Sequence, residues 1–556
     1  MINKLSVTNF RSLEEISIEL DPKLTALVGA NGAGKSSILR ALDVILGPTW
    51  PSLRSLRVPQ DWTGFDDSRP LRIAVEFSDP LTFKDKLNKP ASISGFEVTC
   101  APYKIKTAKA EAGDPNFNFH PLGTDGKVPV VATSAPQKGQ PPGFGPLLNV
   151  PAELRDQVKA LFIDHNRSIF QHQPWARSSI LSRILAPARK ELSSLEHSDG
   201  RTHREVFVER YHQAVDALQT PHIKAVEEVI SETAKQALGF MGSRSVAGLD
   251  VGFGFADPAN PLNSLRLVYR ENGLELPAEE LGLGVQSAIV VGIFEAARKI
   301  GGNIGLVLIE EPEMYLHPQA QRYFYKLLCT LAESGACQVV YSTHSPIFAD
   351  MGKFEGIRLI SRPDHKATDC SRIDKQADVE ELGKRRDKQK MGAFNPSRSE
   401  VFFANRALLV EGAADVLAIR ALAEKEGFDL DGEGIAVIEC GSKSAIPFVT
   451  KVCQAFDIPI TVMHDSDIYS VPPGIPDIAE TRIRKQNSEE EVLNAEIVAS
   501  VKSGTEVFIL EPSLEGALGI GRNAADKPMK VLNELTKRDI SDWPDAVIAA
   551  YRALTS

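Results

Sequence analysis

The 556-residue sequence lacks the features that mark membrane and secreted proteins. Its most apolar helix-like stretch, Ala288–Phe294, is broken by Glu295. A membrane-spanning helix needs roughly 18–20 uncharged apolar residues, far more than this stretch offers. The N-terminus alternates apolar and polar residues and then turns acidic, without the apolar core and small-residue cleavage site of a signal peptide. These absences predict a cytoplasmic protein with no membrane partner.

Cysteine is also scarce, and the chain as a whole is acidic rather than basic. The six cysteines are scattered without any C-x-x-C spacing, which excludes a disulfide framework and a structural zinc site. A net charge of −10 argues against a nucleic-acid coat protein, which is usually basic. It does not exclude an enzyme acting on DNA, because DNA contacts can be confined to a local basic patch. Gly383–Lys390 is one such run, although a solvated linker would look the same.

The length suggests about three or four domains, and a hydrophobic content of 43% is that of a globular protein. Apolar periodicity predicts an α/β segment over 1–150, a helical insert over 151–240 and a resumed α/β segment over 241–365. A polar stretch over 366–397 is typical of a linker, and a new α/β unit follows over 398–556.

Within these segments, the region from about Asp79 to Leu147 has many Pro, Gly and Lys residues and predicts irregular loops. The helical insert is indicated by apolar residues at helical spacing, and it would serve either local packing or dimerisation. These residues are Leu154, Val158, Leu161 and Phe162, followed by Phe207, Tyr211, Ala214 and Leu218.

Residues 29–36 match the phosphate-binding pattern G-x-x-x-x-G-K-[ST], between a predicted strand at Leu24–Val28 and a predicted helix at Ser36–Leu46. Lys35 would reach the β- and γ-phosphates of ATP, and Ser36 would hold one Mg²⁺. The helix N-terminus adds a favourable dipole for the phosphates. The expected ATP-binding residues here are Asn31, Gly32, Ala33, Gly34, Lys35, Ser36 and Ser37.

Further segments follow in the order typical of an ABC-type ATPase. An apolar strand ends in Glu310, which would support Mg²⁺ through water, and Glu311, which would polarise the attacking water. Two adjacent acids at a strand end are costly unless they meet a cation. His344 follows another apolar strand and would contact the γ-phosphate. Upstream, Leu281–Ser287 includes Gly284 and Gln286 and would face the γ-phosphate of a partner subunit.

This combination resembles the ATPase heads of the structural-maintenance-of-chromosomes and recombination-mediator group. Asn9-Phe10-Arg11 is similar to a segment of that group, which implies that Arg11 lies in the nucleotide site. The turn Pro312–Pro318 would contact a partner subunit. The resemblance implies a homodimer or higher homo-oligomer. The segment Leu281–Ser287 is looser than the transporter signature LSGGQ, which argues against fast ATP turnover.

A second group of acids follows strands of the C-terminal unit. Glu411 ends one predicted strand, and Asp415 lies one helical turn beyond it. Asp465 and Asp467 end a second strand on the same side of the pleat. Four convergent carboxylates make a hard-oxygen site suited to Mg²⁺ or Mn²⁺. Glu439–Ser444 falls between them at the end of another apolar strand.

The E-G-x-x-D and D-x-D strand ends resemble the Toprim pattern. A Toprim unit behind a chromosome-type ATPase head resembles the overcoming-lysogenization-defect (OLD) nucleases, which include the nuclease of Gabija anti-phage defence. The resemblance implies DNA cleavage or nicking with two metal ions, often in anti-phage defence, and a helicase or other defence partner encoded nearby. It also implies that Glu511 and Glu515, one helical turn apart, face a second metal, and that Lys527 stabilises the transition-state phosphate.

The predicted fold class is therefore α/β: an ABC-type P-loop ATPase with an inserted helical module, followed by a Toprim domain. Two other functions stay open. One is a structural or recombination ATPase whose Toprim-like unit only binds DNA or a metal ion. The other is a primase or topoisomerase, for which no accessory domain is recognisable, and Tyr469 lies too close to the metal acids to be an obvious nucleophile.

Overall fold

The structure is a computed structural model. It describes residues 1–103, 111–132, 134, 143–158, 160–164, 169, 173–174, 179–185, 187, 220–239, 250–255, 265–271, 274–300, 305–335, 337–362, 368–371, 395–521 and 525–556. Parts of the predicted insert 151–240 and linker 366–397, and the whole basic run Gly383–Lys390, lie outside these residues. Phe207, Tyr211, Ala214 and Leu218 lie outside them too.

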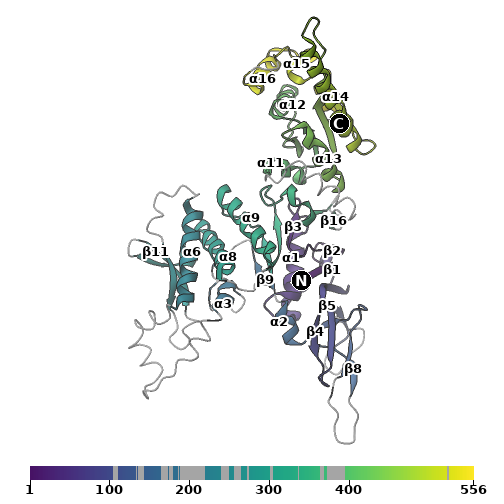
Figure 1. Cartoon of the computed structure of the whole chain (residues 1–556). Helices are drawn as coiled ribbons and strands as arrows, with labels where there is room; N and C mark the ends of the chain where they lie inside the picture. The colour runs from purple at the N-terminus through teal and green to yellow at the C-terminus, as the bar shows by residue number, and fades with distance from the viewer. Residues whose placement is uncertain are drawn as a thin grey trace. The chain divides into compact units, whose positions relative to one another are not determined.

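The chain forms two compact units (Figure 1). The first comprises Met1–Leu27, Asn31–His344 and Ile360–Cys370. The second comprises Val28–Ala30, Ser345–Leu359 and Ser371–Ser556. The domain boundaries drawn from the sequence stay predictions.

The first unit begins with an antiparallel sheet in the order β2-β1-β4-β5-β6. Its strands are β1 (Ile2–Phe10), β2 (Leu13–Glu19), β4 (Leu71–Lys84), β5 (Pro90–Pro102) and β6 (Pro115–Leu122). The prediction of irregular loops from Asp79 to Leu147 is therefore wrong for β5, β6 and the end of β4. Alternation exists there, since Phe96, Val98 and Cys100 are all buried on one face. The frequent Pro and Gly residues hide this strand-like alternation in the sequence.

A second sheet has the order β16-β15-β3-β14-β13-β9. Its strands are β3 (Leu24–Val28), β9 (Ala160–Ile163), β13 (Gly305–Glu310), β14 (Cys337–Thr343), β15 (Ile357–Ser361) and β16 (Asp369–Ser371). β9, β13 and β14 run parallel. Every residue of β14 is buried, as expected for a parallel strand covered on both faces.

Helix α1 (Lys35–Leu46) contacts strands of both sheets and so fixes the P-loop between them. Its buried Ile38, Leu39 and Leu42 join one hydrophobic core with residues of both sheets. The position of the nucleotide loop therefore depends on this core.

The strand β9 corrects the predicted helical insert. The apolar spacing predicts a helix at Leu161 and Phe162, but these residues lie in β9 and pair with Val307 and Leu308 of β13. A short apolar run fits a buried parallel strand as well as a helix, and periodicity alone does not separate the two.

The helices of the first unit continue beyond α1, and the α6 and α8 pair lies side by side in Figure 1. They are α2 (Ala152–Gln157), α3 (Ile180–Ile184), α6 (Pro221–Gly239), α8 (Leu283–Ile300) and α9 (Pro318–Glu333). The smaller sheets contain β7 (Val130–Ala132) with β8 (Phe144–Pro146), and β10 (Asp250–Phe255) with β11 (Leu265–Glu271) and β12 (Leu274–Pro277). In the part of the chain that the structure describes, each helix is too short or too polar to cross a membrane.

The second unit contains a parallel four-stranded sheet in the order β18-β17-β19-β20. Its strands are β17 (Arg406–Val410), β18 (Ile435–Glu439), β19 (Ile460–Asp465) and β20 (Val507–Leu510). Its helices are α11 (Pro396–Ser399), α12 (Ala413–Glu426), α13 (Ile446–Ala455), α14 (Asp477–Ser500), α15 (Leu514–Ala517), α16 (Lys527–Lys537) and α17 (Asp545–Thr555).

Helices cover this sheet on both faces. Leu408 and Val410 pack into a core with α12, α16 and α17. α13 contacts β17 and β19 as well, and α14 packs on α13. Because all four strands run parallel, their carboxyl ends meet at one edge of the sheet, where the predicted acids lie.

The contact between α6 and α8 depends on Gly292. A Cβ atom at that position would lie 2.9 Å from the carbonyl oxygen of Ile230 on α6. We expect Gly292→Val to lower the free energy of unfolding by about 1–3 kcal/mol through overpacking. Thermal unfolding followed by circular dichroism measures this. The matched control is Gly239→Ala on α6, where a Cβ meets nothing within 4 Å. Equal melting temperatures for the two variants would refute this account of the helix contact.

Candidate ATPase and metal-binding sites

The P-loop requires glycine at position 34. Gly34 has φ of +112°, and an added Cβ would lie 2.6 Å from Thr368 Oγ1 and 2.9 Å from Ser12 Oγ. Thr368 Oγ1 lies 3.1 Å from the carbonyl oxygen of Ser12 and 2.9 Å from that of Ala33. The loop is therefore held from outside by Thr368. Ser12 Oγ also bonds Ser37 Oγ at 3.2 Å, so the hydroxyl of Ser37 already has a protein partner.

Lys35 begins α1 and its side chain is buried. Burial lowers the pKa of Lys35 to about 8, while the carboxylates of Glu311 and Glu313 act in the opposite direction. The ammonium group is therefore charged near neutral pH and lies close to two acids of the same site. It is therefore positioned to neutralise the negative charge of a bound triphosphate.

The paired acids follow β13 as predicted. Glu310 pairs with Ser342 of β14, and Glu311 comes next with φ of +47° and its backbone N–H 3.1 Å from the carbonyl oxygen of Ser342. His344 Nε2 lies 3.7 Å from Glu311 Oε1. Burial and the nearby Lys35 cation lower the pKa of His344, so its imidazole is mostly neutral at pH 7. The structure thus brings Lys35, Glu311 and His344 together.

Glu313 is a residue whose role the sequence did not reveal. Its Oε1 accepts hydrogen bonds from Thr343 Oγ1 at 2.9 Å and from the backbone N–H of His344 at 2.6 Å. Burial raises the pKa of this carboxyl. Glu313 therefore ties the turn after β13 to the end of β14. The sequence predicts for the segment Pro312–Pro318 only a turn that contacts a partner subunit.

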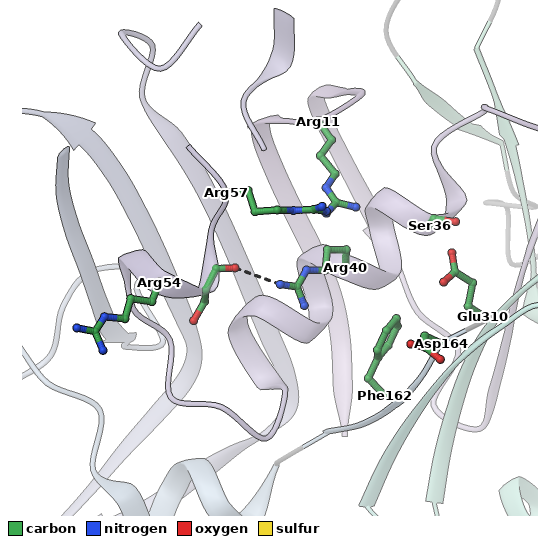
Figure 2. Close-up of a pocket in the computed structure, with 9 residues that line it drawn as sticks. Arg11, Ser36, Arg40, Arg54, Arg57, Phe162, Asp164 and Glu310 are labelled. Carbon is green, nitrogen blue, oxygen red and sulfur yellow. Dashed lines mark hydrogen bonds between the residues drawn. The ribbon is translucent and has the colours of Figure 1, made fainter. Parts of the chain in front are cut away.

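Beside the P-loop, a cavity of about 310 Å³ collects three predicted nucleotide-site residues, Arg11, Ser36 and Glu310 (Figure 2). Arg11 Nε donates to Asp61 Oδ1 at 2.8 Å, which holds the guanidinium at the cavity. The remaining lining residues lie outside recognisable motifs, so sequence reasoning missed them. They are Arg40, Arg54, Ser55, Arg57, Phe162 and Asp164.

The segment Leu281–Ser287 leads into α8 as expected, but Gln286 is occupied within the protein. Its Nε2 donates to the carbonyl oxygens of Glu279 and Leu281, at 3.1 and 2.8 Å, and its Oε1 accepts from Ile169 N. These bonds shape the turn before the helix. Direct nucleotide contacts from Gly284 and Gln286 stay predictions.

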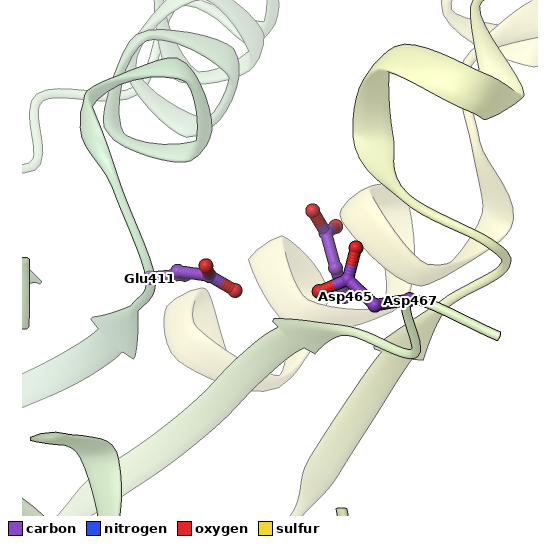
Figure 3. Close-up of side chains that lie close together, drawn as sticks. All are labelled: Glu411, Asp465 and Asp467. Atoms are coloured by element: carbon purple, nitrogen blue, oxygen red, sulfur yellow. The ribbon is translucent and has the colours of Figure 1, made fainter. Parts of the chain in front are cut away.

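In the second unit, Glu411, Asp465 and Asp467 converge at the carboxyl edge of the sheet (Figure 3). One carboxylate oxygen from each lies within 4.8 Å of the others. Glu411 follows β17, Asp465 ends β19, and Asp467 lies two residues further on. Asp465 Oδ1 also accepts from the backbone N–H of Leu514 at 3.0 Å.

Asp415 lies at the start of α12 and is buried. Its Oδ2 accepts from the backbone N–H of Gly412 at 3.0 Å, so it caps the helix. Burial raises the pKa of Asp415 to about 7, although the hydrogen bond from the Gly412 N–H lowers it. Burial and neighbouring carboxylates raise the pKa of Glu411 to about 7 and that of Asp465 to about 8.

The loop carrying Asp467 is held by contacts that the sequence did not reveal. Asp467 has φ of +54°, and its backbone N–H donates to the carbonyl oxygen of Pro512 at 2.7 Å. Tyr469 Oη donates to Asp467 Oδ1 at 3.3 Å, and Lys443 Nζ donates to Oδ2 at 3.4 Å. Lys443 belongs to the predicted segment between the acid pairs. Its role became visible only when the strand ends were brought together.

The expected helical relation between Glu511 and Glu515 is wrong. Glu511 follows β20 and precedes Pro512, while α15 begins at Leu514, so only Glu515 is helical. Proline after Glu511 disfavours helix at that residue. Glu515 raises the pKa values of Glu411 and Asp415, and its Oε1 lies 3.5 Å from Lys527 Nζ. Glu515 is thus close enough to Glu411 and Asp415 to affect their pKa values, and Lys527 pairs with Glu515. Metal-binding roles for Glu511 and Glu515 stay predictions.

The acid cluster fits a divalent cation. Glu411 Oε2 is buried and lacks a hydrogen-bond partner among the described residues, and three carboxylates face one another at short range. Like charges that are half-buried at such distances are unfavourable unless a proton or a cation neutralises them. Oxygen donors of this kind suit Mg²⁺ or Mn²⁺.

Two family models match the chain. The AAA ATPase domain matches residues 1–119 and 164–349, and the overcoming lysogenization defect protein-like TOPRIM domain matches residues 402–467. The chain is 45% identical to an OLD nuclease of Thermus scotoductus, over all of this chain and 99% of that protein.

The chain belongs to the OLD nuclease family.

The family assignment confirms the predicted resemblance and fold class, an α/β P-loop ATPase followed by a Toprim domain. A second OLD-family relative, the Old nuclease of Escherichia phage P2, is 24% identical over 84% of this chain and 77% of its own length. A crystal structure of an Smc head bound to the C-winged helix domain of ScpA also matches, with 14% sequence identity and a TM-score of 0.39. The match covers 66% of this chain and 97% of that chain.

The raised pKa values of the acid cluster predict that metal binding releases protons. With pKa values raised to about 7 and about 8, Glu411 and Asp465 are partly protonated near neutral pH, and a metal ion that binds their carboxylates displaces those protons. We therefore expect Mn²⁺ affinity to increase from pH 6 to pH 8, by about tenfold per pH unit for each proton released. Calorimetry in buffers of different ionisation enthalpy counts these protons. Asp465→Asn should release fewer, and an affinity independent of pH would contradict the assignment.

Proposed function

We propose that this OLD-family chain is an ATP-hydrolysing, divalent-metal-dependent endonuclease that nicks or cleaves DNA. The observation that carries the proposal is the convergence of Glu411, Asp465 and Asp467 within 4.8 Å in a TOPRIM domain. The ATPase site in the same chain supports an ATP-dependent activity. A module that only binds DNA has no use for clustered carboxylates, because they repel phosphates.

In the ATPase site, Lys35 would neutralise the β- and γ-phosphates, and Ser36 and Glu310 would hold one Mg²⁺. Glu311 would orient the attacking water, with His344 beside it at 3.7 Å. Glu313 would keep His344 in place through the hydrogen bond to its backbone N–H. Arg11 would contact the nucleotide from the cavity that Ser36 and Glu310 share with it.

In the nuclease site, Glu411, Asp465 and Asp467 would hold the first of two Mg²⁺ or Mn²⁺ ions, and Glu515 would contribute to the second. Such ions supply a nucleophilic water at neutral pH and neutralise charge on the phosphate. Asp465 would lie between the two positions. Lys527, tethered by Glu515 at 3.5 Å, would stabilise negative charge on the phosphate during cleavage.

We also propose a homodimer or higher homo-oligomer, in which Leu281–Ser287 faces a partner copy's nucleotide and the turn Pro312–Pro318 contacts the partner subunit. The family resemblance supports a role in anti-phage defence or DNA processing, with a helicase or other defence protein as partner. ATP hydrolysis would then regulate cleavage rather than perform it, since the two sets of catalytic residues belong to separate sequence segments.

The ATPase assignment predicts different effects for two variants. Lys35→Ala should abolish ATP binding, because it removes the cation buried beside the phosphate loop. Glu311→Gln should keep binding but slow hydrolysis by about 100-fold or more, the usual contribution of a positioned general base. Calorimetric titration and phosphate release measure the two effects. Lys326→Ala, on the exposed side of α9, is the control, and normal ATP binding by Lys35→Ala would disprove the site.

The nuclease assignment predicts that Asp465→Ala loses DNA nicking by a factor on the order of 100 or more, while ATP hydrolysis stays near that of the wild type. Glu411→Ala should behave similarly, since each substitution removes one ligand of the same cluster. Plasmid nicking over a Mg²⁺ or Mn²⁺ titration, with phosphate release followed in parallel, measures both activities.

The matched control is Asp431→Ala, an exposed acid of the same unit whose side chain is 74% accessible. It should nick like the wild type. If Asp465→Ala also nicks at the wild-type rate, the nuclease proposal fails, and a structural or recombination ATPase with a DNA-binding Toprim-like unit takes its place.

A further inference from the structure

Lys443 is a buried lysine in the second unit. Its side chain is only 5% accessible, and its three ammonium N–H groups have three acceptors. They are the carbonyl oxygen of Ser466 at 2.9 Å, Asp467 Oδ2 at 3.4 Å and Glu490 Oε2 at 2.8 Å. A buried cation is retained at such a place only when it is fully paired. Lys443 therefore links the loop after β19 to helix α14.

Helix α14 is largely exposed, but one polar stripe of it faces this loop. Asn487, Glu490 and Asn494 recur at spacings of three and four, which places them on one side of the helix. Asn487 bonds both the N–H and the carbonyl oxygen of Tyr469, at 3.1 and 2.8 Å. Asn494 Nδ2 donates to the carbonyl oxygen of Ser466 at 3.0 Å, the same atom that Lys443 contacts.

These contacts surround Asp467 on both sides. Asp467 has φ of +54°, a conformation that costs a non-glycine residue energy and needs support from outside the loop. Ser466 before it and Tyr469 after it are each anchored by α14, while its own carboxylate accepts from Lys443. The second oxygen is held by Tyr469 Oη.

We propose that Lys443 and the α14 stripe of Asn487, Glu490 and Asn494 form a bracket that positions Asp467 for metal binding. Lys443 is a positioning residue here, and Glu490 acts by holding Lys443 in place. The inference rests on the proposed metal-dependent function, but it concerns residues outside the carboxylate cluster of Glu411, Asp465 and Asp467. Outer residues that orient metal ligands typically change affinity or activity by 10–100-fold.

The test uses the full chain, with Mn²⁺ as the probe and calorimetry as the primary measurement. Lys443→Met should weaken Mn²⁺ binding by about 10–100-fold, because Asp467 loses its support. Glu490→Gln should weaken it less, since Lys443 keeps its two other acceptors. The double variant should be no worse than Lys443→Met alone, because Glu490 acts through Lys443.

Matched controls come from the same helix. Lys485 and Glu489 form an exposed pair on α14, with side chains 78% and 68% accessible and 3.9 Å between the charged atoms. Lys485→Met and Glu489→Gln should leave Mn²⁺ affinity unchanged. Thermal unfolding shows whether Lys443→Met is folded, and the partly exposed Glu490→Gln keeps the proposal testable if it is not.

Plasmid nicking separates positioning from general damage. We expect Lys443→Met and Glu490→Gln to raise the Mn²⁺ concentration for half-maximal nicking, with the rate at saturating Mn²⁺ largely retained. If both bind Mn²⁺ like Glu489→Gln, the bracket is refuted. If the wild type never nicks DNA but Mn²⁺ affinity still falls in Lys443→Met, the bracket stands and the nuclease proposal fails.

Discussion

The repulsion between closely spaced, half-buried carboxylates is the constraint on which the metal site of the second unit depends. Glu411, Asp465 and Asp467 are forced together because parallel strands end at one edge of a sheet. Their charges must then be offset by protons, by a cation or by lysine. The raised pKa values of Glu411 and Asp465 indicate that protons offset part of this charge when no metal is bound. Lysine charge is also present: Lys443 pairs with Glu490, and Lys527 pairs with Glu515.

The ATPase site also holds a charged group that is costly to bury, but here the group is a cation. There a buried lysine, Lys35, lies near Glu311 and Glu313, and burial works against its charge. A triphosphate with its metal ion supplies both the negative and the positive charge that this arrangement needs. Both sites therefore hold charged groups that the protein alone leaves only partly neutralised, which is a property of sites built for charged ligands.

Backbone strain accompanies this electrostatic arrangement. Glu311 and Asp467 both adopt positive φ within two residues of the end of a parallel strand, and the backbone N–H of each donates to a carbonyl oxygen of a neighbouring strand or loop. Such conformations persist only where the surroundings impose them. In the first unit the support comes from β14, and in the second it comes from the loop after β20 together with Lys443 and α14. The ends of the sheet strands thus determine where the acids lie, and polar contacts determine the orientation of their side chains.

The sequence by itself determined the chemistry that depends on local order. The P-loop needs its glycines and Lys35 in one continuous segment, and Glu310, Glu411 and Asp465 each follow an apolar strand, so a strand-plus-motif pattern was enough to find them. Tertiary structure decided what depends on residues far apart in the chain. Leu161 and Phe162 became a strand only by pairing with β13, and Glu511 was separated from Glu515 by the turn at Pro512. The arginines around the nucleotide cavity and the link from Lys443 to Glu490, 47 residues apart, leave no local pattern, because side chains converge there only after the sheets have formed.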